Sequence, residues 1–295
     1  MPSRKHVRLQ LPSGTLTLGA RTLIMGVLNV TPDSFSDGGA FLDPRRAVAH
    51  ALQMQRDGAD IIDIGAESTR PGSLGVTAVE ELRRLLPVFE ALRGRLKIPI
   101  SIDTRKSAVA EVALGAGASI INDVSGLRTD PRLAEVAVRR RVPLILMHMR
   151  GTPLTMQKKP FAKNVLRDVT AGLHRSIALA RRAGVAKNQI ILDPGIGFGK
   201  SFSQNYELLA RLPEIAKLGY PLLVGTSRKG FLGATLAKSG PAGALKSVPV
   251  QDRIWATAAT VAASILGGAR IVRVHDVKEM AQVARVADHI LNSPR

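Results

Sequence analysis

Polar side chains follow nearly every run of Ile, Val and Leu in this chain of 295 residues, at the point where the run ends. The acidic, amide and hydroxyl side chains at these points are Asn29, Glu67, Asp103, Asn122, Asp123, Asp193 and Ser227. The basic ones are Arg70, Lys229, Arg273 and His275. Amides and carboxylates together supply donors and acceptors, which suits a flat heterocycle with an amino-pyrimidinone edge. The basic side chains are complementary to an anionic leaving group or a carboxylate.

Each of these residues also has a structural interpretation that requires no ligand. Asp103 or Asp123 alone could cap the helix that follows it, and Asp193-Pro194-Gly195 could be only a turn. Lys229 by itself would be an ordinary surface lysine. However, an unpaired polar group within an apolar strand end costs about 1–3 kcal/mol, and independent accidents would not place so many at equivalent points. The recurrence therefore favours an enzyme over a structural protein.

Three further polar residues are expected to have structural roles. His148 ends a strand, but it is expected to pack or to orient a neighbour rather than to bind a ligand. Asp63 lies within a strand and should make a contact inside the protein, while Asp276 should cap the last helix. Neither a Ser-His-Asp order nor a His-rich zinc spacing stands out, so the sequence gives no support to these chemistries.

The elements that must position these residues are short, continuous apolar runs, which are typical of strands buried on both faces of a parallel sheet. Eight strands are expected, within residues 23–30, 58–68, 98–104, 115–126, 143–148, 190–195, 219–227 and 267–276. Glycines mark the expected ends of helices, at Gly58, Gly94, Gly184 and Gly219. Asp43-Pro44 and Asp130-Pro131 have the form of helix starts.

Strands that alternate with helices form right-handed βαβ units, and eight such units predict an α/β fold closed into a TIM (β/α)8 barrel. A doubly wound open sheet is the alternative. Residues 6–18 alternate apolar and polar around a Pro-Ser-Gly turn, which predicts a β-hairpin that plugs the N-terminal end of the barrel. Because no linker divides the chain, we expect one domain over residues 1–295, with the hairpin in 1–20 and the barrel in 21–292.

The composition narrows the class of protein further. Without cysteine there can be no disulfide, thiolate nucleophile or cysteine metal site. The N-terminus lacks the apolar run of a signal peptide, and the apolar stretch 257–269 is too short to span a bilayer, so a cytoplasmic protein without membrane contact is expected. The net charge of +19 attracts anions. Nucleic acid is nevertheless not an expected partner, because the basic residues are dispersed and aromatic residues make up only 3%.

The motifs at the strand ends closely resemble those of the dihydropteroate synthase family. The first is GVLNVTPDSFSDGG from residue 26, and the second is GAESTRPG from residue 65. The others follow in the family's order as SIDTRK, INDVSG, LMHMRGTPLTMQ, DPGIGFGK, GTSRKGFLG and RVHDV. Arg150 and Ile196 depart from the commonest family pattern without removing a proposed chemical group. The resemblance covers about residues 20–290 and implies the same TIM barrel.

The resemblance also implies a reaction. It joins 6-hydroxymethyl-7,8-dihydropterin diphosphate to p-aminobenzoate, and the products are 7,8-dihydropteroate and pyrophosphate. The mechanism implied is dissociative, so that the cation left on the methylene carbon is delocalised into a dihydropterin ring held by Asp103 and Asp193. The amine of p-aminobenzoate, which is neutral near pH 7, then attacks without a strong general base.

The family pattern implies a role for each candidate site residue. Catalytic roles are implied for Asp103, Lys229, Arg273 and His275. Pterin binding is implied for Asp103, Asn122, Met147, Asp193, Lys229 and Arg273. The p-aminobenzoate pocket and the mobile loops around it are expected to contain Phe35, Ser36, Thr69, Arg70, Phe198 and Ser227. Diphosphate binding is implied for Asn29, Arg70, Arg273 and His275. Asn29 would also bind Mg²⁺, the expected cofactor, whose other ligands would be phosphate oxygens and waters.

Homodimers are usual in this family, so a homodimer through the helices after Val248 is expected. Two other functions stay open. A pterin-binding methyltransferase of the same barrel superfamily would keep the pterin-binding carboxylates and asparagine, but it has no reason to keep Asn29, Lys229 or Arg273 with His275. A non-catalytic, polyanion-binding derivative would account for the charge but not for the intact motifs.

Overall fold

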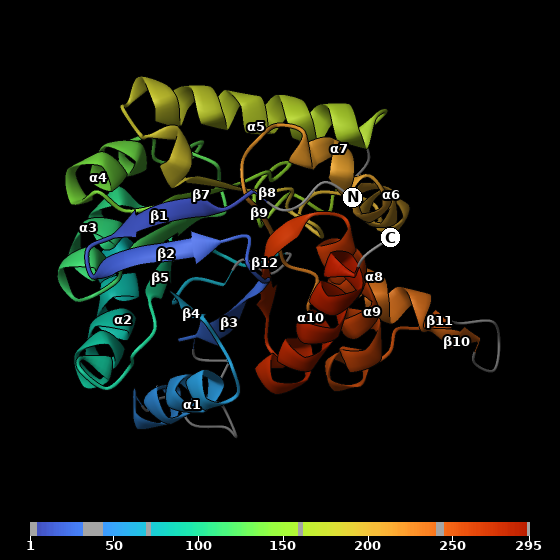
Figure 1. Cartoon of the computed structure of the whole chain (residues 1–295), viewed down its shortest axis with the longest axis horizontal. Coiled ribbons are helices and arrows are strands. Elements are labelled where there is room, and N and C mark those ends of the chain that lie inside the picture. The colour runs from blue at the N-terminus through green and yellow to red at the C-terminus, as the bar shows by residue number, and fades with distance from the viewer. Residues whose placement is uncertain (1–4, 32–43, 69–71, 159–161, 240–244, 294–295) are drawn as a thin grey trace.

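A closed barrel of eight parallel strands forms the centre of the protein, as the sequence predicts (Figure 1). The computed structural model describes residues 5–31, 44–68, 72–158, 162–239 and 245–293. Neighbouring strands follow the order β12-β3-β4-β5-β6-β7-β8-β9 around the barrel. Their bounds are β3 Leu23–Asn29, β4 Ile61–Gly65, β5 Ile100–Asp103, β6 Ile120–Asp123, β7 Leu144–Met147, β8 Ile190–Asp193, β9 Leu222–Val224 and β12 Ala269–Val274. Pairing of β12 with β3 closes the sheet and excludes the doubly wound alternative.

Helices surround the barrel and connect its successive strands (Figure 1). Their bounds are α1 Pro44–Arg56, α2 Ala78–Leu92, α3 Ser107–Gly115, α4 Arg132–Arg140, α5 Val165–Arg182, α6 Phe202–Ala210, α9 Ile254–Leu266 and α10 Val277–Asn292. The sequence did not predict several smaller elements, which are α7 Leu212–Ala216, α8 Gly230–Thr235, β10 Lys238–Ser239 and β11 Leu245–Lys246. The expected hairpin is present as β1 Val7–Leu11 and β2 Gly14–Leu18.

Local sequence signals explain where the helices begin and end. Pro44 opens α1, while Asp43 before it lies outside the described residues. At the start of α4, the Asp130 carboxylate accepts the backbone N–H of Arg132 at 3.2 Å. Gly58, after α1, has a φ of 104°, in the left-handed region that favours glycine. The other expected helix ends also have a positive φ, at Gly94, Gly184 and Gly219.

The hairpin fills the end of the barrel opposite the strand ends that carry the polar residues. Its Leu9, Leu11 and Leu18 are buried in one apolar cluster with side chains from the barrel strands. The barrel members of this cluster are Leu23, Met25, Ile61, Ile120, Ile145, Ile191, Leu223 and Ile271. Gln10 and Gln189 fix the hairpin further, because the Gln10 N–H donates to Oε1 of Gln189 at 2.8 Å and Nε2 of Gln189 donates to the Gln10 carbonyl at 2.9 Å. This end of the barrel is therefore a packed core, as expected for a TIM barrel.

We expect Leu9→Ala to lower the free energy of unfolding by about 2–5 kcal/mol, because it opens a cavity where a fully buried leucine seals the barrel. Urea denaturation followed by circular dichroism measures the loss. Arg8→Ala, at the exposed neighbouring position, is the matched control and should change stability little. Equal effects of the two substitutions would contradict the role of the hairpin as a packed plug.

Candidate active site

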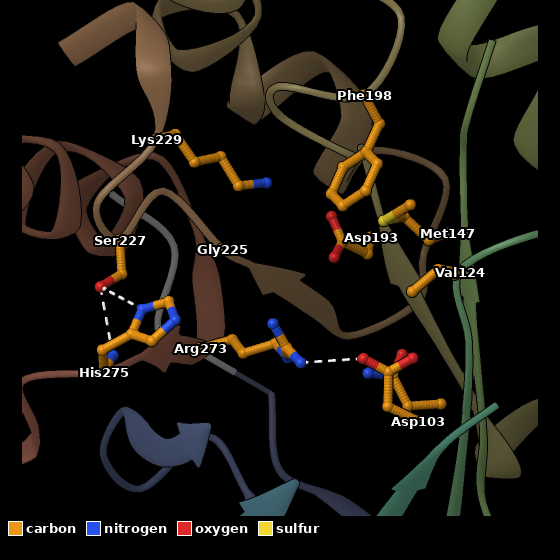
Figure 2. Close-up of a pocket in the computed structure, with 11 residues that line it drawn as sticks. Asp103, Val124, Met147, Asp193, Phe198, Gly225, Ser227, Lys229, Arg273 and His275 are labelled. Atoms are coloured by element: carbon orange, nitrogen blue, oxygen red, sulfur yellow. Dashed lines mark hydrogen bonds and ion pairs between the residues drawn. The ribbon is translucent and has the colours of Figure 1, made fainter. Parts of the chain in front are cut away.

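A pocket opens at the carboxyl ends of the barrel strands, where the sequence placed its polar residues (Figure 2). Its lining contains residues expected at the site, namely Asp103, Asn122, Met147, Asp193, Phe198, Ser227, Lys229, Arg273 and His275. Val124 and Gly225 also line it and were not expected. Residues separated by up to 172 positions in the sequence (Asp103 to His275) thus face one cavity. The location is where TIM barrels build their active sites.

Strand register explains why these side chains share one level. Asp103 pairs in register with Asn122 across β5 and β6, and Met147 pairs with Asp193 across β7 and β8. Each of these residues is at or near the end of its strand, so its side chain lies at the rim of the barrel. The parallel arrangement therefore converts a repeated sequence pattern into a ring of functional groups.

The centre of the site is a network of charges around Asp63 and Arg273. Asp63 is fully buried within β4, and its Oδ2 accepts hydrogen bonds from Nε of Arg273 at 2.6 Å and from Nδ2 of Asn122 at 3.0 Å. Nη2 of Arg273 donates to Oδ2 of Asp103 at 2.9 Å, as Figure 2 shows. Asp63 does not line the pocket, so the expectation of an internal contact is confirmed. One guanidinium thus bridges two carboxylates.

Asp63 also decides which end of the Asn122 amide faces the pocket. A carboxylate accepts hydrogen bonds, so the amide nitrogen must point to Asp63 and the amide oxygen must point away from it. With Asp103 and Asp193, the floor of the pocket is then rich in hydrogen-bond acceptors. Such a floor suits the donor-rich edge of a planar, nitrogen-containing ring.

The pKa of Asp103 is raised to about 8, chiefly because burial disfavours the charged carboxylate and also because the negative charge of Asp63 is near. Arg273 acts in the opposite direction. Burial raises the pKa of Asp193 as well, while the charge of Lys229 opposes that shift. Shifted carboxylates in a cleft are typical of functional sites.

Lys229 is not the surface lysine that its local sequence would suggest. Its ammonium donates to the carbonyl of Ile196 and lies 4.3 Å from the centre of the Phe198 ring. Burial lowers the pKa of Lys229 to about 7, and Asp193 partly restores it. Residue 196 departs from the family pattern in its side chain. Lys229 contacts its backbone carbonyl, so this contact does not depend on the side chain.

Ser227 and His275 form a pair on the opposite wall of the pocket from Asp103 (Figure 2). The Ser227 hydroxyl accepts the backbone N–H of His275 at 3.1 Å and lies 3.0 Å from its Nδ1. The hydroxyl can therefore donate its own hydrogen to Nδ1, which leaves the ring proton on Nε2. In that tautomer, His275 offers Nε2–H as a donor to an anion.

Some strand-end residues have the structural roles that the sequence left open. The Asp123 carboxylate accepts the backbone N–H groups of Ser125 at 2.8 Å and Leu127 at 2.6 Å, so it shapes a turn. Asp193 does both, because Oδ1 accepts the Gly195 N–H at 2.7 Å while the residue still lines the pocket. Asp103 caps no helix in this way; its carboxylate is paired with Arg273.

His148 and Asp276 also have structural roles, and the role of Asp276 differs from the expected helix cap. His148 is buried, and burial lowers its pKa to about 2, so the ring is neutral at neutral pH. The burial of the ring agrees with the expected packing role, and the backbone N–H of His148 donates to the Asp193 carbonyl at 2.9 Å, which joins β7 to β8. Asp276 does precede α10, but its carboxylate is paired with Arg228 rather than with the N–H groups of the helix.

A second charge network lies behind the site, and sequence reasoning missed it. Glu67, which follows β4, is buried and ion-paired with both Arg105 and Lys106. Lys106 also lies 2.7 Å from the fully buried Glu81 of α2. Glu67 therefore does not face the pocket as its place after a strand suggested. It anchors the start of the segment that leads to Thr69.

Of the remaining expected site residues only Asn29 is described, and it is not among the residues that line the pocket. Asn29 ends β3 and is half-buried. Phe35, Ser36, Thr69 and Arg70 lie outside the described residues. Among the residues that the structure does describe, no cluster of three His, Cys, Asp or Glu side chains could hold a metal ion.

Comparisons with known proteins cover nearly the whole chain. Residues 25–275 match the family described as pterin binding enzyme. A dihydropteroate synthase of Synechocystis is 49% identical over 270 residues, which span 92% of this chain and 90% of that protein. A structure of the Xanthomonas albilineans dihydropteroate synthase with 4-aminobenzoic acid has a TM-score of 0.88 at 40% identity, covering 98% of this chain and 100% of that one. Another, in complex with 7,8-dihydropteroate, has a TM-score of 0.84 at 38% identity, covering 97% and 100%.

The raised pKa of Asp103 predicts a stability that falls as the pH rises. The folded protein holds this proton up to a pKa of about 8, whereas the unfolded chain releases it near 3.8. Between these values the folded state binds more protons, so the contribution is complete below the lower value and is lost as the pH rises through the higher one. Urea denaturation across this range measures it. Asp103→Asn should lack this component, and an unchanged pH slope in the variant would contradict the shift.

Proposed function

The chain belongs to the dihydropteroate synthase family of pterin-binding enzymes, and we infer that it joins 6-hydroxymethyl-7,8-dihydropterin diphosphate to p-aminobenzoate. The products are 7,8-dihydropteroate and pyrophosphate. The observation that carries this function is the pocket itself, which combines an acceptor-rich floor with a cationic wall. A pterin needs the acceptor-rich floor, and a departing diphosphate needs the cationic wall. A methyltransferase acting on a folate would have no use for that cationic wall.

The floor of the pocket fits the pterin ring. Asn122, Asp103 and Asp193 present acceptors to the ring's amino and N–H groups, and Met147 supplies an apolar side. Lys229 supplies a donor from the opposite direction, where it can meet a ring oxygen or nitrogen. Binding of the ring would thus replace the Ile196 carbonyl as a partner of Lys229.

The cations of β12 and the segment after it fit the diphosphate. Arg273 is held in place through Nε by Asp63, and His275 offers Nε2–H in the tautomer that Ser227 favours. Asn29, at the end of the adjacent strand β3, supplies an amide oxygen of the kind that Mg²⁺ accepts. When bound, Mg²⁺ would neutralise charge on the departing diphosphate. Arg70 belongs to this proposed set by family pattern.

The p-aminobenzoate ring fits beside Phe198 and the aliphatic stem of Lys229, with Ser227 close to its carboxylate. Phe198 and Lys229 are only partly buried, whereas Asn122 and Asp193 are nearly inaccessible. The second substrate therefore lies nearer the opening than the pterin does. Phe35, Ser36 and Thr69 are proposed to close over it.

Bond breaking precedes bond making in the proposed mechanism. The bond between the methylene carbon and the diphosphate oxygen breaks, and both electrons leave with pyrophosphate, whose charge Arg273 and His275 stabilise. The positive charge left behind spreads into the dihydropterin ring, next to Asp103 and Asp193, and there it favours the ionised form of both carboxyl groups over the protonated form that burial favours in the empty pocket. The amine nitrogen of p-aminobenzoate then bonds to the methylene carbon and releases one proton.

We also propose that the protein is a cytoplasmic homodimer. No helix within the described part of the chain is long and apolar enough to cross a membrane. Exposed apolar side chains occur on α9, α10 and the turn before α9, as expected for the helices after Val248. They are Val250 at 42% exposure, Trp255 at 81%, Val286 at 60% and Ile290 at 61%. A second copy of the chain would cover them.

Pyrophosphate release from the dihydropterin diphosphate, measured with and without p-aminobenzoate at fixed Mg²⁺, tests the function directly. We expect release to depend on p-aminobenzoate and to match the dihydropteroate formed. Chelation of the metal should suppress the rate, because charge on the leaving group is then less well neutralised. A folded protein that binds the pterin but gives no turnover would contradict the proposal.

Asp103→Asn should reduce kcat by about 100-fold or more while changing the Kd of the dihydropterin substrate less than tenfold. The neutral amide keeps a hydrogen-bonding group in the pocket but cannot stabilise a cation on the ring. Isothermal titration gives the Kd and the pyrophosphate assay gives kcat. Equal losses in binding and turnover would argue against the cation-stabilising role.

Trp255→Lys should convert the dimer to a monomer, because it places a charge where the most exposed large apolar side chain is covered by the partner. Sedimentation velocity measures the change. Val79→Lys is the matched control, since Val79 is 78% exposed on α2, away from the proposed interface, and should leave the dimer intact. A wild-type protein that sediments as a monomer would overturn this part of the proposal.

A further inference from the structure

Three backbone carbonyls converge on one buried ammonium group behind the pocket wall. Nζ of Lys200 donates to the carbonyl oxygens of Gly195 at 2.8 Å, Phe198 at 3.0 Å and His148 at 3.2 Å. Lys200 is only 2% exposed. An ammonium has three N–H donors, and each has a carbonyl partner here. Lys200 is thus fully engaged by the backbone and has no donor left for a substrate.

The segment from 194 to 200 requires such a cation because its backbone is packed against another backbone. Gly195 and Gly199 both have a φ of 66°, and a Cβ at these positions would collide with the carbonyl oxygens of His148 and Arg150. Two backbone segments that pack without side chains between them bring their carbonyl dipoles close together. Burial lowers the pKa of Lys200 to about 7, but three carbonyl acceptors around one nitrogen favour the ammonium form, which replaces a repulsion between dipoles with an attraction.

The same segment forms one wall of the substrate pocket. Phe198 lines the pocket, and the Ile196 carbonyl accepts from Lys229 on the pocket side. On another side, Oδ1 of Asn205 accepts the N–H of Gly197 at 2.6 Å. Lys200 adds a hydrogen bond between this segment and the residue after β7, through the carbonyl of His148.

We propose that Lys200 is a positioning residue that fixes the wall carrying Phe198 for p-aminobenzoate, a role that rests on the proposed function. Lys200 itself touches no substrate. Its loss would let the 195–198 backbone move away from β7 and carry the Phe198 ring with it. Asp193 would be affected less, because its backbone pairs with Met147 of β7 within the barrel. The effect should therefore fall on p-aminobenzoate rather than on the pterin.

The test compares Lys200→Met with wild type in steady-state assays that vary each substrate in turn. Methionine keeps most of the length of lysine but has no donors, so all three carbonyls lose their partner. We expect the KM for p-aminobenzoate to rise on the order of 10- to 100-fold, because misplacement by about 1 Å can have this effect, while the KM for the dihydropterin diphosphate changes less than threefold. Lys217→Met, at an exposed lysine, is the matched control.

Lys200→Arg keeps the charge and should restore part of the p-aminobenzoate KM, although its planar guanidinium cannot match three carbonyls arranged around one nitrogen. If Lys200→Met does not fold, Lys200→Arg should show the same pattern with a smaller change. Its KM for p-aminobenzoate should rise, while its KM for the dihydropterin diphosphate should change little. Equal rises in both KM values, or no rise in either, in a folded variant would overturn the proposal. A failure of the proposed function would be seen separately, as a lack of turnover in the unmodified protein.

Discussion

The bond between Asp63 and Arg273 is the interaction on which the rest of the site depends. A fully buried carboxylate without a partner is costly, and Arg273, whose side chain is 23% exposed, supplies the positive charge beside Asp63. The pair sets the direction of the Asn122 amide and places a cation beside Asp103. The charge of Asp63 raises the pKa of Asp103, and the charge of Arg273 opposes that shift. A substrate that brings its own cationic character in the transition state meets carboxylates already arranged for it.

On the other side of the pocket, basic side chains are likewise held in place by contacts with the protein. Lys229 and Lys200 both donate to carbonyls of the 195–198 segment; Lys229 is partly buried on its pocket side and Lys200 is buried behind it. Burial lowers the pKa of Lys229 to about 7. The charge of Asp193 partly restores the pKa of Lys229, so the basic group is held at a fixed position beside the pocket. Cations fixed by the protein need no rearrangement when a negative charge develops on a leaving group.

The sequence predicts the barrel and much of the pocket because both leave local signals. Apolar runs mark the strands, glycines mark helix ends, and a polar residue at a strand end must lie at the barrel mouth whatever its neighbours are. Lys200 left no such signal, because its partners are backbone carbonyls that any residue carries. Glu67 could not be assigned for a related reason: its position after β4 suits the pocket, but its direction depends on Arg105 and Lys106 from the next unit.

The hairpin that fills one end of the barrel affects how substrates enter the site and how products leave it. Because Leu9, Leu11 and Leu18 fill that end, the substrates and products of the proposed reaction enter and leave at the opposite end, where the described residues form the pocket. In the proposed arrangement the pterin lies deeper than p-aminobenzoate, so the pterin binds first. The shape of the pocket then sets the order of substrate binding, and the large product must leave before the next turnover.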